Sequence, residues 1–144
     1  METIIQVGEW LVGLGIGWVG GRSSRNRAIR AQNHDRYLAV YHEFGRLFDL
    51  VQWHDKISDC DLLRFKGATH SALWLFGPEI KEYAKEVFDH GRKFGLTKEL
   101  LKERGMVREE REKLATAHSD EWAWFYAQYH VLDEKFFKYL NMNS

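Results

Sequence analysis

The first thirty residues constrain this chain more than any other part of it. Residues 3–21 are apolar apart from Gln6 and Glu9, and a cluster of arginines follows directly. A helix needs about 20 largely apolar residues to cross a bilayer, and basic residues at one end keep that end in the cytoplasm. We therefore expect residues 1–21 to form a transmembrane or membrane-anchoring helix, with the N-terminus outside and residues 22–144 as a cytoplasmic α-helical domain. The basic residues expected to contact lipid headgroups are Arg22, Arg25, Arg27 and Arg30.

Three glycines recur at every fourth position of the apolar run. Gly13, Gly17 and Gly21 share one helix face, and a face without side chains lets another helix approach closely. Glu9 lies one turn earlier on the same stripe. A ring of such helices would bring this carboxylate near the shared axis, whereas a single helix would leave it in water at the outer headgroup level. We predict self-association through the glycines and treat Glu9 as a candidate pore-lining residue.

Two other interpretations of the apolar run compete with a membrane anchor. A cleaved signal peptide carries its basic residues before the apolar stretch, and here they follow it. A helix buried against a partner protein is the more serious alternative, because the mean hydropathy of the chain, −0.49, is that of a soluble protein. Under that alternative the chain is a non-enzymatic interaction module, and its partner is another protein.

Composition narrows the remaining possibilities. The formal net charge is zero, so bulk charge predicts no nucleic-acid partner. The single cysteine, Cys60, allows no disulfide within the chain and fits a reducing compartment. One proline in 144 residues favours helices throughout. We expect no cofactor.

The apolar spacing predicts an all-α bundle of about four helices after the anchor. The first, over residues 25–56, repeats apolar positions every three or four residues, as in a bundle or coiled coil. Ser58 or Asp59 should cap a second helix, and Pro78 should open a third that ends at Gly95. A short helix from Thr97 and a long one from Val107, bent near Asp133, complete the prediction. The repeating positions of the first helix, which we assign to oligomerisation, are Tyr37, Tyr41, Phe44, Phe48 and Val51.

Two segments carry a resemblance to known proteins. The chain has a glycine-bearing apolar run with a basic stop, then Leu75-Phe76-Gly77-Pro78-Glu79-Ile80-Lys81-Glu82-Tyr83, and it closes with Phe136-Phe137-Lys138-Tyr139-Leu140. It resembles small bacterial membrane-anchored helical proteins and, less closely, the membrane accessory proteins of RNA-targeting CRISPR systems. The resemblance implies a single-pass protein of the bacterial inner membrane. It also implies a pore-forming or membrane-perturbing role in antiviral defence.

Those accessory proteins carry a degenerate Arg-x4-6-His motif of the HEPN ribonuclease type. The spacing occurs here at Arg64 and His70, and again at Arg27 and His34. A histidine can move the proton of a 2′-hydroxyl, and an arginine can stabilise the phosphate. Phe65 stands where the motif usually has a polar residue. Arg64 and His70 are therefore the weak catalytic candidates, and a HEPN-like ribonuclease is a further alternative.

Other candidate sites are weaker. His118 and Glu121 share a helix face, but one such pair does not make a metal site, and we expect His118 to face solvent. We predict no metal centre. In the aromatic block near the C-terminus, Trp124 points away from the stripe formed by its neighbours, so we expect Trp124 to be the exposed contact residue. The stripe expected in the core comprises Trp122, Phe125, Tyr126 and Tyr129.

Overall fold

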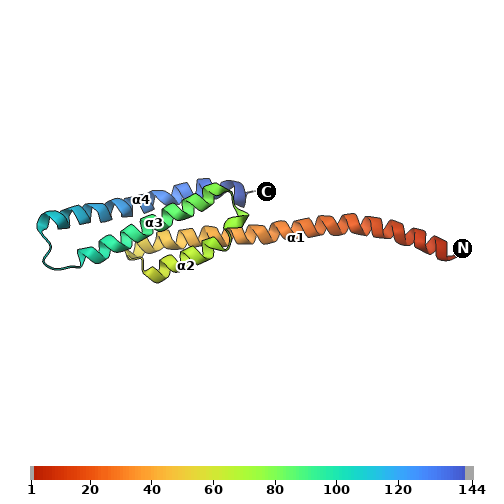
Figure 1. The fold of residues 1–144 in the computed structure, drawn as a ribbon. Coiled ribbons are helices and arrows are strands. Elements are labelled where there is room, and N and C mark those ends of the chain that lie inside the picture. The colour runs from red at the N-terminus through yellow and green to blue at the C-terminus, as the bar shows by residue number, and fades with distance from the viewer. Residues whose placement is uncertain (1, 142–144) are drawn as a thin grey trace. The chain divides into compact units, whose positions relative to one another are not determined.

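The computed structural model describes the backbone of residues 2–141 and the side chains of residues 25, 27–72 and 74–141. Its elements are α1 (Glu2–His54), α2 (Asp59–His70), the 3₁₀ turn η1 (Leu73–Leu75), α3 (Pro78–Leu101) and α4 (Arg108–Leu140). No strand occurs between residues 2 and 141, which confirms the all-α class. The chain divides into two compact units, Met1–Asp35 and Arg36–Ser144, so α1 contributes to both. Figure 1 shows α2, α3 and α4 packed alongside the C-terminal part of α1.

Local signals start two of the helices where the sequence predicts. The Ser58 hydroxyl accepts from the Asp61 amide at 3.1 Å, and Asp61 accepts from the Ser58 amide at 3.0 Å. This capping box satisfies two amides that the first turn of α2 leaves open. Pro78 is the first residue of α3, where its missing N–H costs nothing. Asp55 ends α1 with a φ of 48°, a left-handed conformation that Asp adopts more readily than most residues.

The predicted helix break between Gly95 and Thr97 is wrong. Helix α3 continues through Gly95 and Thr97 to Leu101. A Cβ at Gly95 would lie 3.2 Å from the Ile57 carbonyl oxygen, so the glycine serves a close approach of backbones and not a helix end. The Thr97 hydroxyl donates to the Lys93 carbonyl at 2.9 Å within the same helix. Helix α4 is one continuous helix through Asp133 to Leu140, and the Asp133 carboxylate accepts a hydrogen bond from Tyr41 of α1.

The core is a cluster of aromatic rings contributed by every helix of the bundle. Phe44 is fully buried and contacts Phe48, Phe65, Tyr83 and Phe136 with ring centroids 4.9–6.3 Å apart. Tilted and edge-on arrangements dominate, as the ring quadrupole favours. The positions that repeat along α1 therefore form the interior of a single chain.

A hydrogen-bonded cluster of Glu79, Lys138 and Tyr139 joins the start of α3 to the end of α4. The Tyr139 hydroxyl donates to Glu79 Oε1 at 2.6 Å and accepts from the Gly77 amide at 2.8 Å. Lys138 Nζ lies 2.7 Å from the same carboxylate oxygen. The hydrogen bonds from Lys138 and Tyr139 lower the pKa of Glu79 to about 2. The end of α4 is thereby tied to the start of α3.

Candidate functional site

The two weak catalytic candidates do not form one site. Arg64 and His70 lie six residues apart on α2, which places them on different sides of the helix. Arg64 Nη2 pairs with Glu43 Oε1 of α1 at 3.1 Å. His70 lines a groove of about 690 Å³ between α2 and α3, beside Phe65 and Phe88. The structure thus pairs Arg64 with Glu43 and leaves His70 in a separate groove, which Lys66, Lys81 and Lys85 also line.

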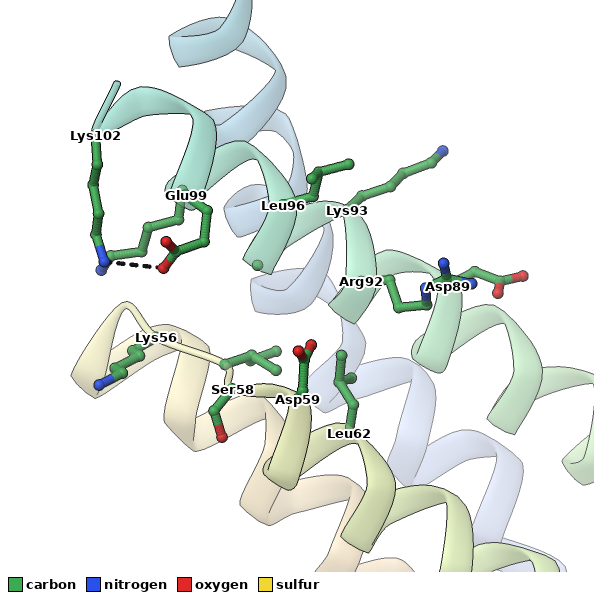
Figure 2. Close-up of a pocket in the computed structure, with 13 residues that line it drawn as sticks. Lys56, Ser58, Asp59, Leu62, Asp89, Arg92, Lys93, Leu96, Glu99 and Lys102 are labelled. Carbon is green, nitrogen blue, oxygen red and sulfur yellow. Dashed lines mark hydrogen bonds and ion pairs between the residues drawn. The ribbon is translucent and has the colours of Figure 1, made fainter. Parts of the chain in front are cut away.

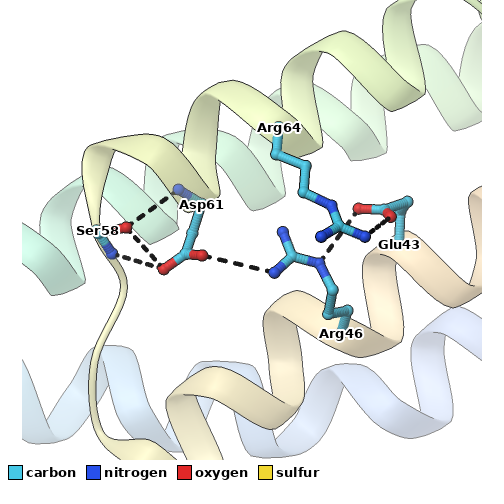
Figure 3. Close-up of polar contacts among 5 residues, drawn as sticks. All are labelled: Glu43, Arg46, Ser58, Asp61 and Arg64. Carbon is cyan, nitrogen blue, oxygen red and sulfur yellow. Dashed lines mark hydrogen bonds and ion pairs between the residues drawn. The ribbon is translucent and has the colours of Figure 1, made fainter.

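Arg64 belongs to an ion-pair cluster that holds α2 against α1 (Figure 3). Glu43 also accepts from Arg46 Nε at 3.4 Å, and Arg46 Nη1 reaches Asp61 at 3.5 Å. Burial acts to raise the pKa of Asp61, but hydrogen bonds from Ser58 and Arg46 outweigh it and leave that pKa below its ordinary value. Both acids of the cluster are therefore engaged by residues of this chain.

The residues assigned to oligomerisation lie inside or against the core. Phe44, Phe48 and Val51 are fully buried, while Tyr37 and Tyr41 are partly buried and pack on the cluster. Their rings contact Phe65 of α2, Tyr83 of α3, Phe136 of α4, and Phe76, which lies between η1 and α3. Within the part of the chain that the structure describes, this stripe packs into the interior of the bundle.

Two phenol–carboxylate bonds join α1 to α4 in opposite directions. Tyr41 donates to Asp133 and Tyr129 donates to Asp49, each at 2.6 Å. The bond to Asp133 and partial burial raise the pKa of Tyr41 to about 12. Burial and the bond to Asp49 likewise raise the pKa of Tyr129. These phenols stay protonated far above neutral pH and serve as donors.

A second polar group involves His118, which does not face solvent as predicted. Its side chain is 15% exposed and its ring stacks on Phe94 at 4.4 Å. Nδ1 lies 2.9 Å from the Thr97 hydroxyl and Nε2 lies 3.2 Å from Asp55. The order of Asp, His and Thr is that of a nucleophilic triad. The Thr97 hydroxyl, however, also donates to the Lys93 carbonyl of its own helix. The contacts of His118 with Thr97 and Asp55 therefore join α4 to α3 and to the end of α1.

The expected partner of His118 binds elsewhere. Glu121 lies 2.5 Å from His90 Nδ1 on α3, and the His90 ring stacks on Trp124 at 3.7 Å. Within the part of the chain whose side chains are described, no three His, Cys, Asp or Glu residues are grouped so as to hold a metal ion.

The sequence predicted that Trp124 is exposed, but the exposed aromatic residues include Trp53, Trp122 and Tyr126 instead. Trp124 is half-buried against His90 and Phe125, so its assignment as the exposed contact was wrong. Trp122 and Tyr126, expected in the core, are 40% and 65% exposed and stack on each other at 5.9 Å. Sequence reasoning also missed Trp53, which is 80% exposed at the end of α1. Its place just before the helix end, off the apolar repeat, was the available signal.

A basic groove of about 790 Å³ lies between the start of α2 and the second half of α3. Figure 2 shows Asp59 and Leu62 of α2 on one side, and Glu99 joined to Lys102 on the other. Exposed apolar surface at Leu96 adjoins it. The cations that line it are Lys56, Arg92, Lys93, Lys98 and Lys102, and the acids are Asp59, Asp89 and Glu99. Lys98 and Lys102 are paired with Asp55 and Glu99.

Several predicted residues lie outside the described side chains. Glu9, Gly13, Gly17, Gly21 and Arg22 are in this group, although their backbone belongs to α1. The other members of the basic cluster, Arg25, Arg27 and Arg30, are exposed. Over the residues open to description, none of the helices has the length and apolar character needed to cross a membrane.

Comparison of the chain with models of protein families, with curated proteins and with solved structures finds no match.

Proposed function

We propose that this chain is a membrane-anchored, oligomeric helical protein without a catalytic role. The observation that carries the proposal is the apolar run of residues 3–21 with its basic stop, a pattern typical of a single-pass inner-membrane helix. The bundle of residues 36–144 then lies in the cytoplasm. The closed aromatic core and the engagement of Arg64 by Glu43 are consistent with a structural and not a catalytic bundle.

The most concrete role is that of a pore-forming or membrane-perturbing effector in bacterial antiviral defence. The stripe of Gly13, Gly17 and Gly21 supports helix–helix packing in the bilayer. Glu9 on the same stripe would supply a carboxylate to the shared axis. The defence role itself rests on the resemblance to CRISPR-associated membrane proteins.

Substitution of one glycine tests the assembly. Gly17→Leu places a bulky side chain on the packing stripe, so it should reduce the detergent-extracted oligomer to smaller species and abolish depolarisation of expressing cells. Gly67→Leu is the matched control, because a Cβ at Gly67 meets nothing within 4 Å and the residue is exposed on α2. Unchanged oligomer size in Gly17→Leu, or equal loss in Gly67→Leu, contradicts the proposal.

The basic groove favours a second candidate, a protein-interaction module whose N-terminal helix is buried by its partner. Its lining cations and its apolar floor at Ile57 and Leu62 suit an acidic amphipathic segment. Under this function, deletion of residues 1–21 removes the helix that the partner covers, so it should destabilise a soluble protein. A truncated chain as stable as the full one argues against it.

A further inference from the structure

We draw no further inference here: the strongest candidate, the groove between α2 and α3 beside Phe65 and Phe88, carries none, because Glu82 and Asp89 line it together with Lys66, Lys81 and Lys85 and nothing in the structure shows what covers it.

Discussion

The hydroxyl of Tyr41 donates a hydrogen bond of 2.6 Å to Oδ1 of Asp133, 92 positions away in the chain. Tyr129 makes the reverse connection, from α4 to Asp49 on α1. The two bonds bracket the buried ring of Phe48, which contacts Tyr129 at 5.7 Å. The pairing of α1 and α4 thus combines an apolar interior with two directed polar contacts at its margin.

Alkaline pH should unfold the bundle through these phenols. The pKa of Tyr41 rises from 10.0 to about 12 in the folded protein, and that of Tyr129 is also raised. Their contribution to stability is fully present below pH 10 and is lost as the pH climbs toward about 12, because only the unfolded state ionises readily in that window. Urea unfolding of the full chain in mild detergent, followed by near-ultraviolet circular dichroism, measures the effect.

The double variant Tyr41→Phe/Tyr129→Phe provides the check on this prediction. It should be less stable at neutral pH by about 1 kcal/mol for each bond and should lose stability less steeply above pH 10. Tyr126→Phe, on the exposed side of α4, is the control. An alkaline slope that is the same in the double variant and the wild type contradicts the assignment.

Acid should weaken the cluster of Glu79, Lys138 and Tyr139 that joins α3 to α4. Hydrogen bonds from Lys138 and Tyr139 lower the pKa of Glu79 from 4.5 to about 2. The stabilising contribution of this carboxylate is present above pH 4.5 and is lost as the pH falls toward about 2. Glu79→Gln should flatten the acid limb of the stability curve. Glu112→Gln removes an exposed ion pair on α4 and should leave the acid limb unchanged. Equal curves for both variants would exclude the Glu79–Lys138–Tyr139 cluster as the cause of the acid limb.

Truncation of the central ring should be the most damaging change in the core. Phe44→Ala removes a fully buried ring that touches four others. Such cavities cost about 3–5 kcal/mol. Leu63→Ala, at a position 66% exposed, should change the free energy of unfolding by less than about 0.5 kcal/mol. Similar losses in both variants would mean that the stripe on α1 is not the interior of the bundle.

Two glycines in the bundle should respond in opposite ways to alanine. A Cβ at Gly91 would lie 2.8 Å from Leu62 Cδ2 in the packed α2–α3 interface, whereas one at Gly67 would meet nothing within 4 Å. Gly67→Ala should stabilise the chain by up to about 1 kcal/mol, since alanine favours the helix. In Gly91→Ala the same gain in the free energy of unfolding should be offset by overpacking, which costs about 1–3 kcal/mol. Melting temperatures that rise equally in both variants would contradict the tight α2–α3 contact.

Short-range signals predicted the parts of the fold that depend on a few adjacent residues. Ser58 caps α2 because its partner Asp61 lies three residues away, and Pro78 opens α3 because its own ring sets the backbone angle. The predicted helix end at Gly95 was wrong because a tertiary contact, and not the local sequence, explains this glycine. Gly95 looks like a helix end in the sequence, and only the approach of Ile57 reveals its purpose.

The exposed aromatic residues of the bundle were less predictable, because tertiary contacts decide which stripe of α4 is buried. Helix α4 carries aromatic residues on adjacent stripes, and the spacing does not say which stripe faces inward. The buried side chains are Phe125, Gln128, Leu132, Phe136 and Tyr139. Trp122 and Tyr126 therefore fall at the margin, and Trp124 turns toward His90. The exposed Trp53 lies off the apolar repeat of α1, and that position is the one sequence signal of its exposure.

Fractionation of cells expressing the full chain tests the central claim most directly. Membranes are washed with alkaline carbonate, extracted with mild detergent, and the extracted protein is sized by light scattering. A membrane-anchored assembly predicts carbonate-resistant protein that runs as one discrete oligomer. Protein released as a monomer by the carbonate wash, or found as a monomer in the soluble fraction, would contradict both the anchor and the assembly.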